Sequence, residues 1–325
     1  MNKIGVLTSG GDSPGMNAAV RAVVRTACYL NMEVVGVRYG YKGLLTEDFI
    51  ELNMRNVCDI IHRGGTKIYS ARCIGFREKE AVLKAVENAK RNGIEGLVVI
   101  GGDGSFRGAR DLSNFGLPTI AMPGTIDNDI VCTDYTIGFD TCLNTIQELV
   151  DRLRDTIESH SRCSVVEVMG ARAGYLTLNA GIAVGATAII IPEIPYDIEK
   201  DVINKILRTK ATGKNHFIIM VAEGVRFRDG ITVEQIAKEI EEKTGIETRA
   251  TVLGHMQRGG SPSVRDRVRA SEMGNKAVHL LKDGMSNRVV AAKGELIVDY
   301  DINEALEMKK TIDMDLYNCA MEISL

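Results

Sequence analysis

Two aspartates with one residue between them stand in the stretch MPGTIDNDI, residues 122–130. The apolar run LPTIAM, which is ended by Pro123 and Gly124, is typical of a buried strand that stops at a turn. In open α/β sheets, ligands bind in the loops beyond the carboxyl ends of the strands. We therefore expect Asp127 and Asp129 to lie in a binding loop, where a carboxylate can accept a proton or hold a cation.

Two glycine-rich loops follow other predicted strands and indicate phosphate chemistry. The stretch SGGDSPGMN, residues 9–17, precedes the first predicted helix, whose N-terminus would attract an anion. The stretch GGDGS, residues 101–105, repeats this arrangement with Asp103 between glycines. Because a carboxylate repels phosphate, Asp103 predicts an intervening Mg²⁺, which proteins hold through one or two carboxylates plus substrate phosphates. The alternative is that Asp103 caps the next helix and that the loops are ordinary turns.

These loops match neither common nucleotide-binding fingerprint. The patterns GxGxxG and GxxxxGK(S/T) are absent, and the second predicted strand ends in Val37-Arg38, with no acid to hold a ribose hydroxyl. A nicotinamide-dependent oxidoreductase, which would share the fold class, is therefore disfavoured.

Four arginines stand at the ends of predicted elements. Arg72 lies in a Gly/Ser-rich stretch, Arg162 precedes a predicted strand, and Arg249 and Arg258 stand with His255 around the end of another. In a chain with a net charge of −3, we interpret them as local anion ligands, although a lone arginine is usually a solvated surface charge. His255 fits a core histidine bonded to a backbone carbonyl equally well.

Composition excludes several classes of protein. The chain has 325 residues, 45% of them hydrophobic and 26% charged, which suits a globular protein of two domains. Its slightly acidic balance argues against nucleic acid as a partner. No apolar stretch approaches the ~18 residues that span a bilayer, and the first residues, MNKIGVLTSGGD, lack the basic and apolar regions that are expected of a signal peptide. The seven cysteines are scattered and never form CxxC, so we expect reduced thiols, no zinc site and a cytoplasmic location.

Short β-branched runs alternate with amphipathic stretches along the chain, which is typical of βαβ units. We therefore predict an α/β fold with two doubly wound parallel sheets and a domain break near Phe139. The predicted strands are residues 3–8, 33–38, 96–102, 118–122, 164–170, 187–192, 215–224 and 247–254. The predicted helices are residues 16–30, 55–62, 78–91, 105–114, 139–159, 174–184, 198–210 and 231–243.

The order and spacing of these motifs resemble one family over nearly the whole chain. SGGDSPGMNAAVRAVVR, RGGT, SARC, VVIGGDGS, PGTIDNDI, GFDT, EVMG, AEG and ATVLGHMQRGGSP are similar to the bacterial ATP-dependent 6-phosphofructokinases, phosphofructokinase family A. The resemblance implies Mg²⁺-dependent transfer of the γ-phosphoryl group of ATP to the 1-hydroxyl of fructose 6-phosphate, giving fructose 1,6-bisphosphate and ADP in glycolysis. It also implies two Rossmann-like three-layer αβα domains with the active site in the cleft between them. Residues 1–138 and 257–307 would bind ATP, and residues 139–256 and 308–325 would bind fructose 6-phosphate.

The resemblance also implies roles for individual residues. Asp127 would be the general base, with Thr125, Arg72 and Arg172 near the transferring group, and Asp103 would hold Mg²⁺. The ATP site would comprise Gly11, Arg72, Cys73, Gly102, Asp103, Gly104 and Ser105. The sugar-phosphate site would comprise Thr125, Ile126, Asp127, Arg162, Met169, Gly170, Ala171, Glu223, Arg249, His255 and Arg258.

Members of this family are typically homotetramers, in which the equivalents of Arg162 and Arg249 reach across from a neighbouring subunit. They also bind the effectors ADP and phosphoenolpyruvate at a second site between subunits. The residues that match this effector site are Arg21, Arg25, Asp59, Arg154, Gly185, Thr187, Lys214 and His216. Without the family, Arg21 and Arg25 fit a solvated face of the first helix equally well.

The chain departs from the family pattern in the active site. Ala171 stands where an arginine is usual, so either Arg172, one residue later, takes over that role through an adjustment of the loop, or the role is lost. Pyrophosphate-using relatives carry Asp and Lys where this chain has Gly104 and Gly124, so ATP is favoured over pyrophosphate as the donor.

The effector site departs further from the pattern. Met54 stands in place of an arginine, Thr187 in place of an acid and Thr212 in place of a lysine, so we expect a weakened or altered response to effectors. A non-catalytic sensor of nucleotides or sugar phosphates stays an alternative, because it would use the same loops without needing Asp127.

Overall fold

The computed structural model of the chain describes residues 1–324 and divides into two compact units. The first unit comprises Met1–Ile126, Ile130–Thr141 and Arg258–Lys310. The second unit comprises Asp127–Asp129, Cys142–Gln257 and the described residues from Thr311 onward. Leu325, the last residue of the expected sugar-phosphate domain, lies outside the described residues. This division does not test which ligand each part binds, so the expected binding domains stay a prediction.

The first unit is built on a seven-stranded sheet with the strand order β11-β10-β5-β4-β1-β2-β3. The central strands are parallel, and an antiparallel strand closes each edge. The sequence did not predict the strands β3, β10 and β11. The strand bounds are β1 Lys3–Ser9, β2 Glu33–Val37, β3 Phe49–Leu52, β4 Gly96–Gly101, β5 Thr119–Pro123, β10 Arg288–Lys293 and β11 Leu296–Asp301.

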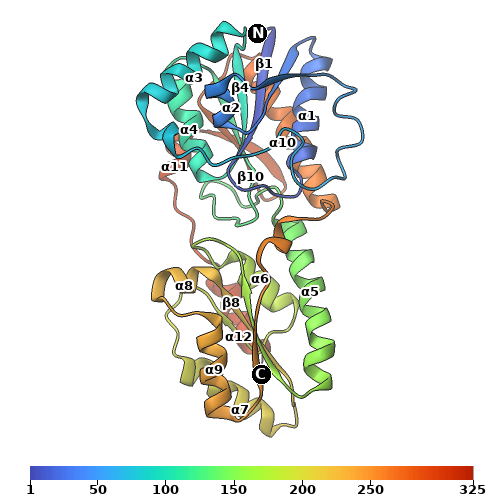
Figure 1. Cartoon of the computed structure of the whole chain (residues 1–325), viewed down its shortest axis with the longest axis vertical. Helices are drawn as coiled ribbons and strands as arrows, with labels where there is room; N and C mark the ends of the chain where they lie inside the picture. The colour runs from blue at the N-terminus through green and yellow to red at the C-terminus, as the bar shows by residue number, and fades with distance from the viewer. Residues whose placement is uncertain (325) are drawn as a thin grey trace. The chain divides into compact units, whose positions relative to one another are not determined.

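Helices cover both faces of this sheet (Figure 1). On one face, alternate strand residues such as Leu7, Val99 and Ala121 pack against α2, α3, α4 and α11, while α1 and α10 pack together on the other. This alternation explains why both faces of the parallel strands are apolar. The helix bounds are α1 Met16–Tyr29, α2 Tyr41–Thr46, η1 Ile74–Arg77, α3 Lys79–Arg91, α4 Asp103–Asn114, α10 Val264–Lys282 and α11 Ile302–Glu307.

The second unit contains a four-stranded parallel sheet with the order β7-β8-β6-β9. Helix α6 packs against β7 and β8, and α9 packs against β6 and β9. The strand bounds are β6 Cys163–Val168, β7 Ala188–Ile190, β8 Phe217–Ala222 and β9 Thr248–Val252. The helix bounds are α5 Phe139–Ser159, α6 Tyr175–Ala183, η2 Ile198–Ile203, α7 Asn204–Ala211, α8 Glu223–Asp229, α9 Val233–Thr244, η3 Gly254–Arg258 and α12 Met314–Ile323.

The expected α/β class is confirmed, with two details corrected. Residues 55–62 form turns rather than the predicted helix, because Asn53 and Asn56 side chains bond nearby backbone amides and Asp59 adopts a left-handed φ of 54°. Residues 198–203 form a single turn of π-helix before α7 rather than one continuous α-helix.

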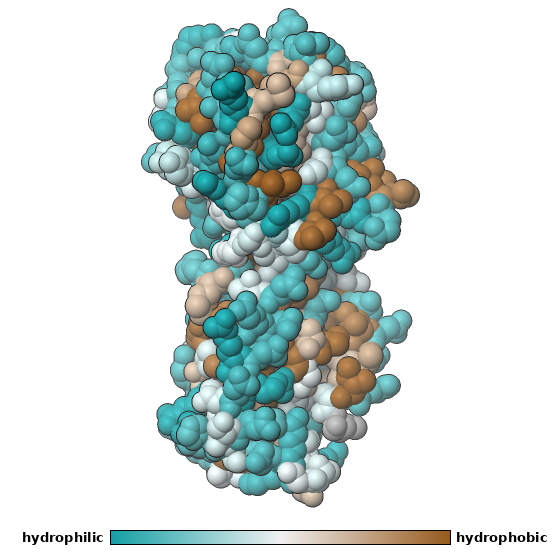
Figure 2. All heavy atoms as spheres, turned by 90° about the vertical axis from the view of Figure 1, so that its right-hand side faces the viewer, coloured by the Kyte–Doolittle hydropathy of each residue, from teal (hydrophilic) through white to brown (hydrophobic). Residues whose placement is uncertain are grey.

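Hydrophilic side chains cover most of the face shown in Figure 2, and apolar ones form small separate groups between them. Within residues 1–324, no helix is long and apolar enough to cross a membrane.

Candidate active site

Three loops meet at the edge of the first unit's sheet that is formed by the carboxyl ends of its parallel strands. They meet there because β5, β4 and β1 are neighbours and end on the same side. The Ser105 hydroxyl donates to the carbonyl oxygen of Ser9 at 3.3 Å and joins the loops after β4 and β1. A methyl group added at Gly102 would lie 3.9 Å from Cβ of Thr125, beside the loop after β5. The structure therefore brings together the three glycine-bearing loops that the sequence singled out.

Asp103 is the first residue of α4 rather than its cap. Gly102 occupies the cap position without a side-chain hydrogen bond, so the capping alternative for Asp103 is wrong. The half-exposed Asp103 carboxylate accepts a hydrogen bond from Nε of Arg107, at 3.0 Å, on the next helical turn. Among the described residues, no group of three His, Cys, Asp or Glu side chains could hold a metal by itself. A single accessible carboxylate fits Mg²⁺, which is usually held jointly with substrate phosphates and water.

Two glycines of this edge differ in the space beside them. A methyl group at Gly104 would meet no atom within 4 Å, whereas one at Gly124 would lie 2.9 Å from Cγ2 of Ile100, inside the core. At Gly11, a methyl group would lie 2.7 Å from Nη1 of Arg258, which also donates to the carbonyl oxygen of Asp12 at 3.2 Å. The guanidinium of Arg258 therefore lies against the first glycine loop.

The segment before Arg72 is attached to the same edge. The Ser70 hydroxyl donates to the carbonyl oxygen of Gly10 at 2.7 Å, and the Thr8 hydroxyl donates to the carbonyl oxygen of Tyr69 at 2.9 Å. Arg72 is exposed, and Cys73, which is partly buried, precedes η1. These bonds position the chain just before Arg72 beside the first glycine loop.

The loop after β5 passes from one unit to the other. Thr125 and Ile126 are buried in the first unit, and Asp127 and Asp129 belong to the second unit and are partly buried. Asn128 between them has a left-handed φ of 52°, which asparagine tolerates better than most residues and which turns the chain sharply.

In the second unit, the loop after β6 is held by Glu223. One carboxylate oxygen of Glu223 accepts from the amides of Gly170, at 3.1 Å, and Ala171, at 2.7 Å. Ala171 has a left-handed φ of 53°, a strained conformation for a residue with a side chain, and Arg172 beyond it is exposed. Gln257, fully buried, accepts from the Met169 amide at 3.1 Å. Sequence reasoning missed Gln257, although it lies between His255 and Arg258 in a motif that was singled out.

The structure places Arg162 and Arg249 at the other end of this sheet. Arg162 precedes β6 and Arg249 is the second residue of β9, so both arginines lie at the amino ends of their strands, whereas His255 and Arg258 follow the carboxyl end of β9. Both arginines donate to Glu247, Arg162 at 2.8 Å and Arg249 at 2.6 Å. These hydrogen bonds, the one from Arg162 first, lower the pKa of the Glu247 carboxyl from its ordinary value. Met169 and Glu223 follow the carboxyl ends of β6 and β8. Within one chain, the sheet therefore separates Arg162 and Arg249 from Met169 and Glu223.

His255 is exposed in η3, so the alternative of a buried core histidine is wrong.

Part of the effector group predicted from the sequence lies together in the second unit. Burial and then the positive charge of Arg154 lower the pKa of Lys214, so the two cations are close. The Arg154 guanidinium also donates to the carbonyl oxygen of Val184, next to Gly185. Thr187 is fully buried, and its hydroxyl has no hydrogen-bond partner among the described residues. In the first unit, Arg21 and Arg25 lie on α1 and Asp59 lies in the turns before residue 62.

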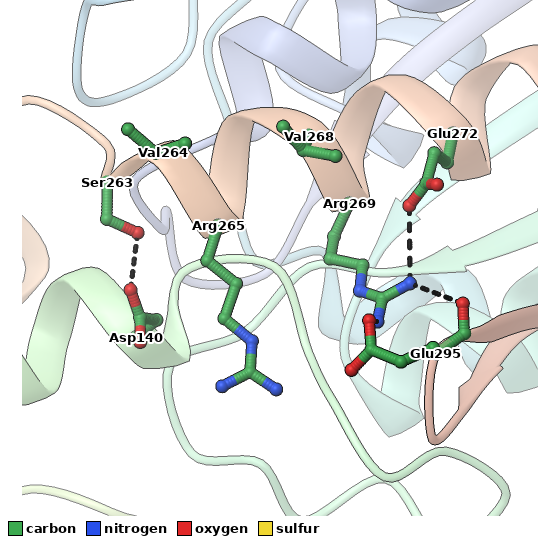
Figure 3. A pocket seen from close by; sticks show the side chains of 8 residues that line it. All are labelled: Asp140, Ser263, Val264, Arg265, Val268, Arg269, Glu272 and Glu295. Atoms are coloured by element: carbon green, nitrogen blue, oxygen red, sulfur yellow. Dashed lines mark hydrogen bonds and ion pairs between the residues drawn. The ribbon is translucent and has the colours of Figure 1, made fainter.

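A pocket of about 600 Å³ lies elsewhere in the first unit, along α10 (Figure 3). The side chains of Arg265 and Arg269 extend from this helix into it, and Arg269 is paired with Glu272 and Glu295. None of the residues that the sequence assigned to ATP, sugar phosphate or effector lines it. The pocket is lined by Asp140, Ser263, Val264, Arg265, Val268, Arg269, Glu272 and Glu295.

The chain is similar to known proteins along its whole length. It is 55% identical over all 325 residues to ATP-dependent 6-phosphofructokinases of Bacillus thuringiensis (strain Al Hakam) and Bacillus mycoides (strain KBAB4), covering 100% of each. Its structure is similar to phosphofructokinase from Saccharomyces cerevisiae, with a TM-score of 0.88 and 34% identity, covering 100% of this chain and 48% of that one. The chain thus spans about half the length of the yeast chain.

A pyrophosphate-dependent phosphofructokinase from Marinobacter aquaeolei has a TM-score of 0.86 over 97% of this chain and 86% of its own, at 22% identity, which bears on the fold alone. Residues 3–281 match the phosphofructokinase family. With this match and a 55% identical relative of equal length, the chain belongs to the phosphofructokinase family.

Proposed function

We propose that this protein is an ATP-dependent 6-phosphofructokinase, which phosphorylates fructose 6-phosphate at its 1-hydroxyl to give fructose 1,6-bisphosphate and ADP in glycolysis. The observation that carries this proposal is the meeting of three glycine loops, Asp103 and Thr125 at one sheet edge. Full-length identity of 55% to proteins named for this activity supports it.

The nucleotide would bind along the loops after β1 and β4. Backbone amides around Gly11 and at the start of α4, residues 102–105, suit phosphate oxygens, since a helix N-terminus favours anions. Arg72 and Cys73 would complete this site from the segment attached at Gly10. Asp103 would hold Mg²⁺, which when bound neutralises charge on the phosphates. Arg107 would then compensate the remaining charge of the Asp103 carboxylate.

Asp127 would be the general base for the 1-hydroxyl of the sugar, with Thr125 contacting the transferring group. A carboxylate with an ordinary pKa near 4 is a weak base for an alcohol at rest. It suffices because the alcohol becomes acidic only as its bond to phosphorus forms. Phosphoryl transfer needs little covalent help from the protein and depends mainly on position and charge.

The sugar phosphate would bind in the second unit at the loop after β6, around Met169, Gly170, Ala171 and Glu223. Ile126, His255 and Arg258 would complete this part of the site, and Arg172 would substitute for the arginine usual at position 171.

Arg162 and Arg249 would serve the site of a neighbouring subunit, so that a complete site needs at least two chains and the assembly is a homotetramer. Their position at the opposite end of the β6–β9 sheet from Glu223 supports this. Between them they hold Glu247, whose place a phosphate dianion could take.

ATP rather than pyrophosphate would be the donor. The open space beside Gly104 supports passage of the α-phosphate and nucleoside, and core side chains occupy the space beside Gly124 where a lysine would be needed for pyrophosphate.

The effector site would respond weakly to ADP and phosphoenolpyruvate. Arg154, Lys214 and His216 would supply positive charge from the second unit, together with Gly185, and Arg21, Arg25 and Asp59 would contribute from a neighbouring chain. Thr187 is buried and has no carboxylate, so the negatively charged metal ligand that the usual acid supplies is missing. Fructose 6-phosphate saturation curves with and without each effector should differ little, and strong shifts by both effectors would contradict this.

The decisive experiment is a coupled assay of the purified protein for ADP production. We expect ADP release that depends on fructose 6-phosphate with ATP as donor, and no comparable turnover when pyrophosphate replaces ATP. A non-catalytic sensor would bind both ligands without turnover. A nicotinamide-dependent enzyme would oxidise or reduce an added nicotinamide cofactor, which is measured as a change in the cofactor's absorbance over time. Either result would overturn the proposal.

A further inference from the structure

Asp266 on α10 is a fully buried carboxylate to which the mechanism above gives no role. It accepts from the Tyr135 hydroxyl at 2.5 Å, from the Gly138 amide at 2.6 Å, and from both the amide, at 2.9 Å, and the hydroxyl, at 2.5 Å, of Thr141. Burying an ionised carboxylate is costly unless its oxygens are fully hydrogen-bonded, and these contacts meet that requirement. Asp266 therefore fixes residues 135–141 in one arrangement.

A second contact attaches the same segment to α10. Ser263 is the residue before α10, and its hydroxyl donates to the Asp140 carboxylate at 2.6 Å, as Figure 3 shows. The amide of Ser263 also donates to the Thr141 hydroxyl at 2.9 Å. The first turn of α5 is thus held by the first turn of α10 through two acidic side chains.

The other side of this segment lies against the proposed transfer site. The Thr136 hydroxyl donates to the carbonyl oxygen of Thr125 at 2.6 Å, and the Ile137 amide donates to the carbonyl oxygen of Pro123 at 2.8 Å. Gly124 and Ile137 also form an isolated parallel bridge. Thr125 and Thr136 are both buried, so the backbone of Thr125 is positioned by a neighbour that Asp266 holds in turn.

We infer that Asp266 is a positioning residue for phosphoryl transfer, which acts through residues 135–137 to fix the backbone of Thr125 where the chain enters the loop that bears Asp127. This inference rests on the proposed function. Fully satisfied buried networks favour a single arrangement, and a displacement of about 1 Å at a reacting group can cost about 10²-fold in rate. Asp266 itself touches no substrate in this scheme, so its effect appears in kcat through Thr125.

The hydrogen bond from Thr136 to Thr125 is the last in the series of contacts that begins at Asp266, and it offers the sharpest test. Thr136→Val removes the donated hydroxyl at nearly constant volume, and Thr136→Ser keeps it. Thr119→Val is the matched control, because the fully buried Thr119 hydroxyl donates to the carbonyl oxygen of Ala109 at 2.8 Å and lies outside the proposed site. Both valine variants lose one buried hydrogen bond, so both should lower Tm by about 2–4 °C.

We expect only Thr136→Val to lower kcat, by roughly 10-fold or more, with the KM for ATP changed by less than about threefold. Thr136→Ser should restore most of kcat, and Thr119→Val should keep it. If Thr136→Val and Thr119→Val lower Tm equally and kcat equally, the network is only structural and the inference is wrong.

Asp266→Asn provides a second measurement on the assembled enzyme. An amide cannot accept from all of these donors, so the variant should show the same kcat loss with the KM for ATP retained, provided that circular dichroism shows it folded. Wild-type kcat in folded Asp266→Asn would overturn the inference even if the wild-type protein is an active kinase. If the wild-type protein shows no fructose 6-phosphate-dependent ADP production, the proposed function fails first and the inference fails with it.

Discussion

Gly104 and Gly124 separate the requirements of folding from those of nucleotide binding. Both lack a side chain beside the proposed phosphate site, but only Gly124 faces the core. In Gly124→Ala, the new methyl carbon would lie 2.9 Å from Cγ2 of Ile100 and 3.3 Å from Cε of Met16, both fully buried. In Gly104→Ala, it would meet no atom within 4 Å.

These distances give opposite expectations for stability. Overpacking of a close-packed core typically costs about 1–3 kcal/mol, so Gly124→Ala should lower the free energy of unfolding by about that amount. Gly104 lies in the first turn of α4, whose backbone conformation alanine adopts without strain. Alanine also has less conformational freedom than glycine in the unfolded chain, so folding loses less entropy. Gly104→Ala should therefore leave the free energy of unfolding unchanged or raise it by about 0.4–1 kcal/mol.

Among the folded variants, the KM for ATP should change more in Gly104→Ala than in Gly124→Ala. If the nucleotide passes beside Gly104, a methyl group there crowds it, and Gly104→Ala should raise the KM for ATP by about 10-fold, since one methyl group against a ligand is typically worth 1–3 kcal/mol. The assays are urea unfolding for stability and steady-state kinetics with varied ATP. A Gly104→Ala variant that is destabilised like Gly124→Ala, or that keeps the wild-type KM for ATP, would refute the reasoning.

Three further outcomes are expected. Asp127→Asn should lower kcat by about 10²–10⁴-fold in the coupled assay with both KM values within several-fold, and near-wild-type kcat would remove Asp127 from the role of base. Two arginines lower the pKa of Glu247 below its ordinary 4.5 in the folded protein, so its stabilising effect is present above that value and is lost as the pH falls through the lowered one. Glu247→Gln should accordingly flatten the dependence of the urea midpoint on pH below about pH 4.5, and an unchanged slope would contradict this. Burial raises the pKa of Cys132 to about 11 and of Cys163 to about 12, so in the folded protein at neutral pH both thiols should resist a disulfide reagent that labels the exposed Cys58; mass spectrometry after labelling should find them modified only once the chain is unfolded.

The parallel part of the fold could be predicted because its strands are buried on both faces. The continuous apolar run of β4 and the glycine that ends it mark both the strand and the edge where the ligand loops gather. The edge strands β3 and β11 were missed because β3 has only four residues and β11 is partly exposed along its length. The strand β10, which lies between β5 and β11 and is mostly buried, was missed as well. β3 and β11 pair with the strands that precede them, β2 and β10, whereas β10 pairs with β5, which is distant in the sequence. Periodicity does not reveal such a distant pairing.

The residues of the candidate site likewise fall into those that the sequence predicted and those that it did not. Its glycines and acids stand in loops directly after strong strands, so their types and spacing predicted that they would meet. Gln257 and Asp266 act through contacts with backbone distant in the sequence, Met169 in one case and residues 138–141 in the other. A buried polar residue of this kind has no local signature, because its partners are chosen by the tertiary fold.

The way in which the chain alternates between the two units has a consequence for biosynthesis. The first unit needs α10 to cover α1 and β10 to pair with β5, yet both come from residues 264–293, after nearly the whole second unit has been made. The segment Cys142–Gln257, in contrast, is continuous and carries all four strands of its own sheet. As the polypeptide emerges from the ribosome at roughly 5–20 residues per second, the four strands of the second unit are all made before β10. The sheet of the first unit therefore keeps an unpaired edge at β5 for longer.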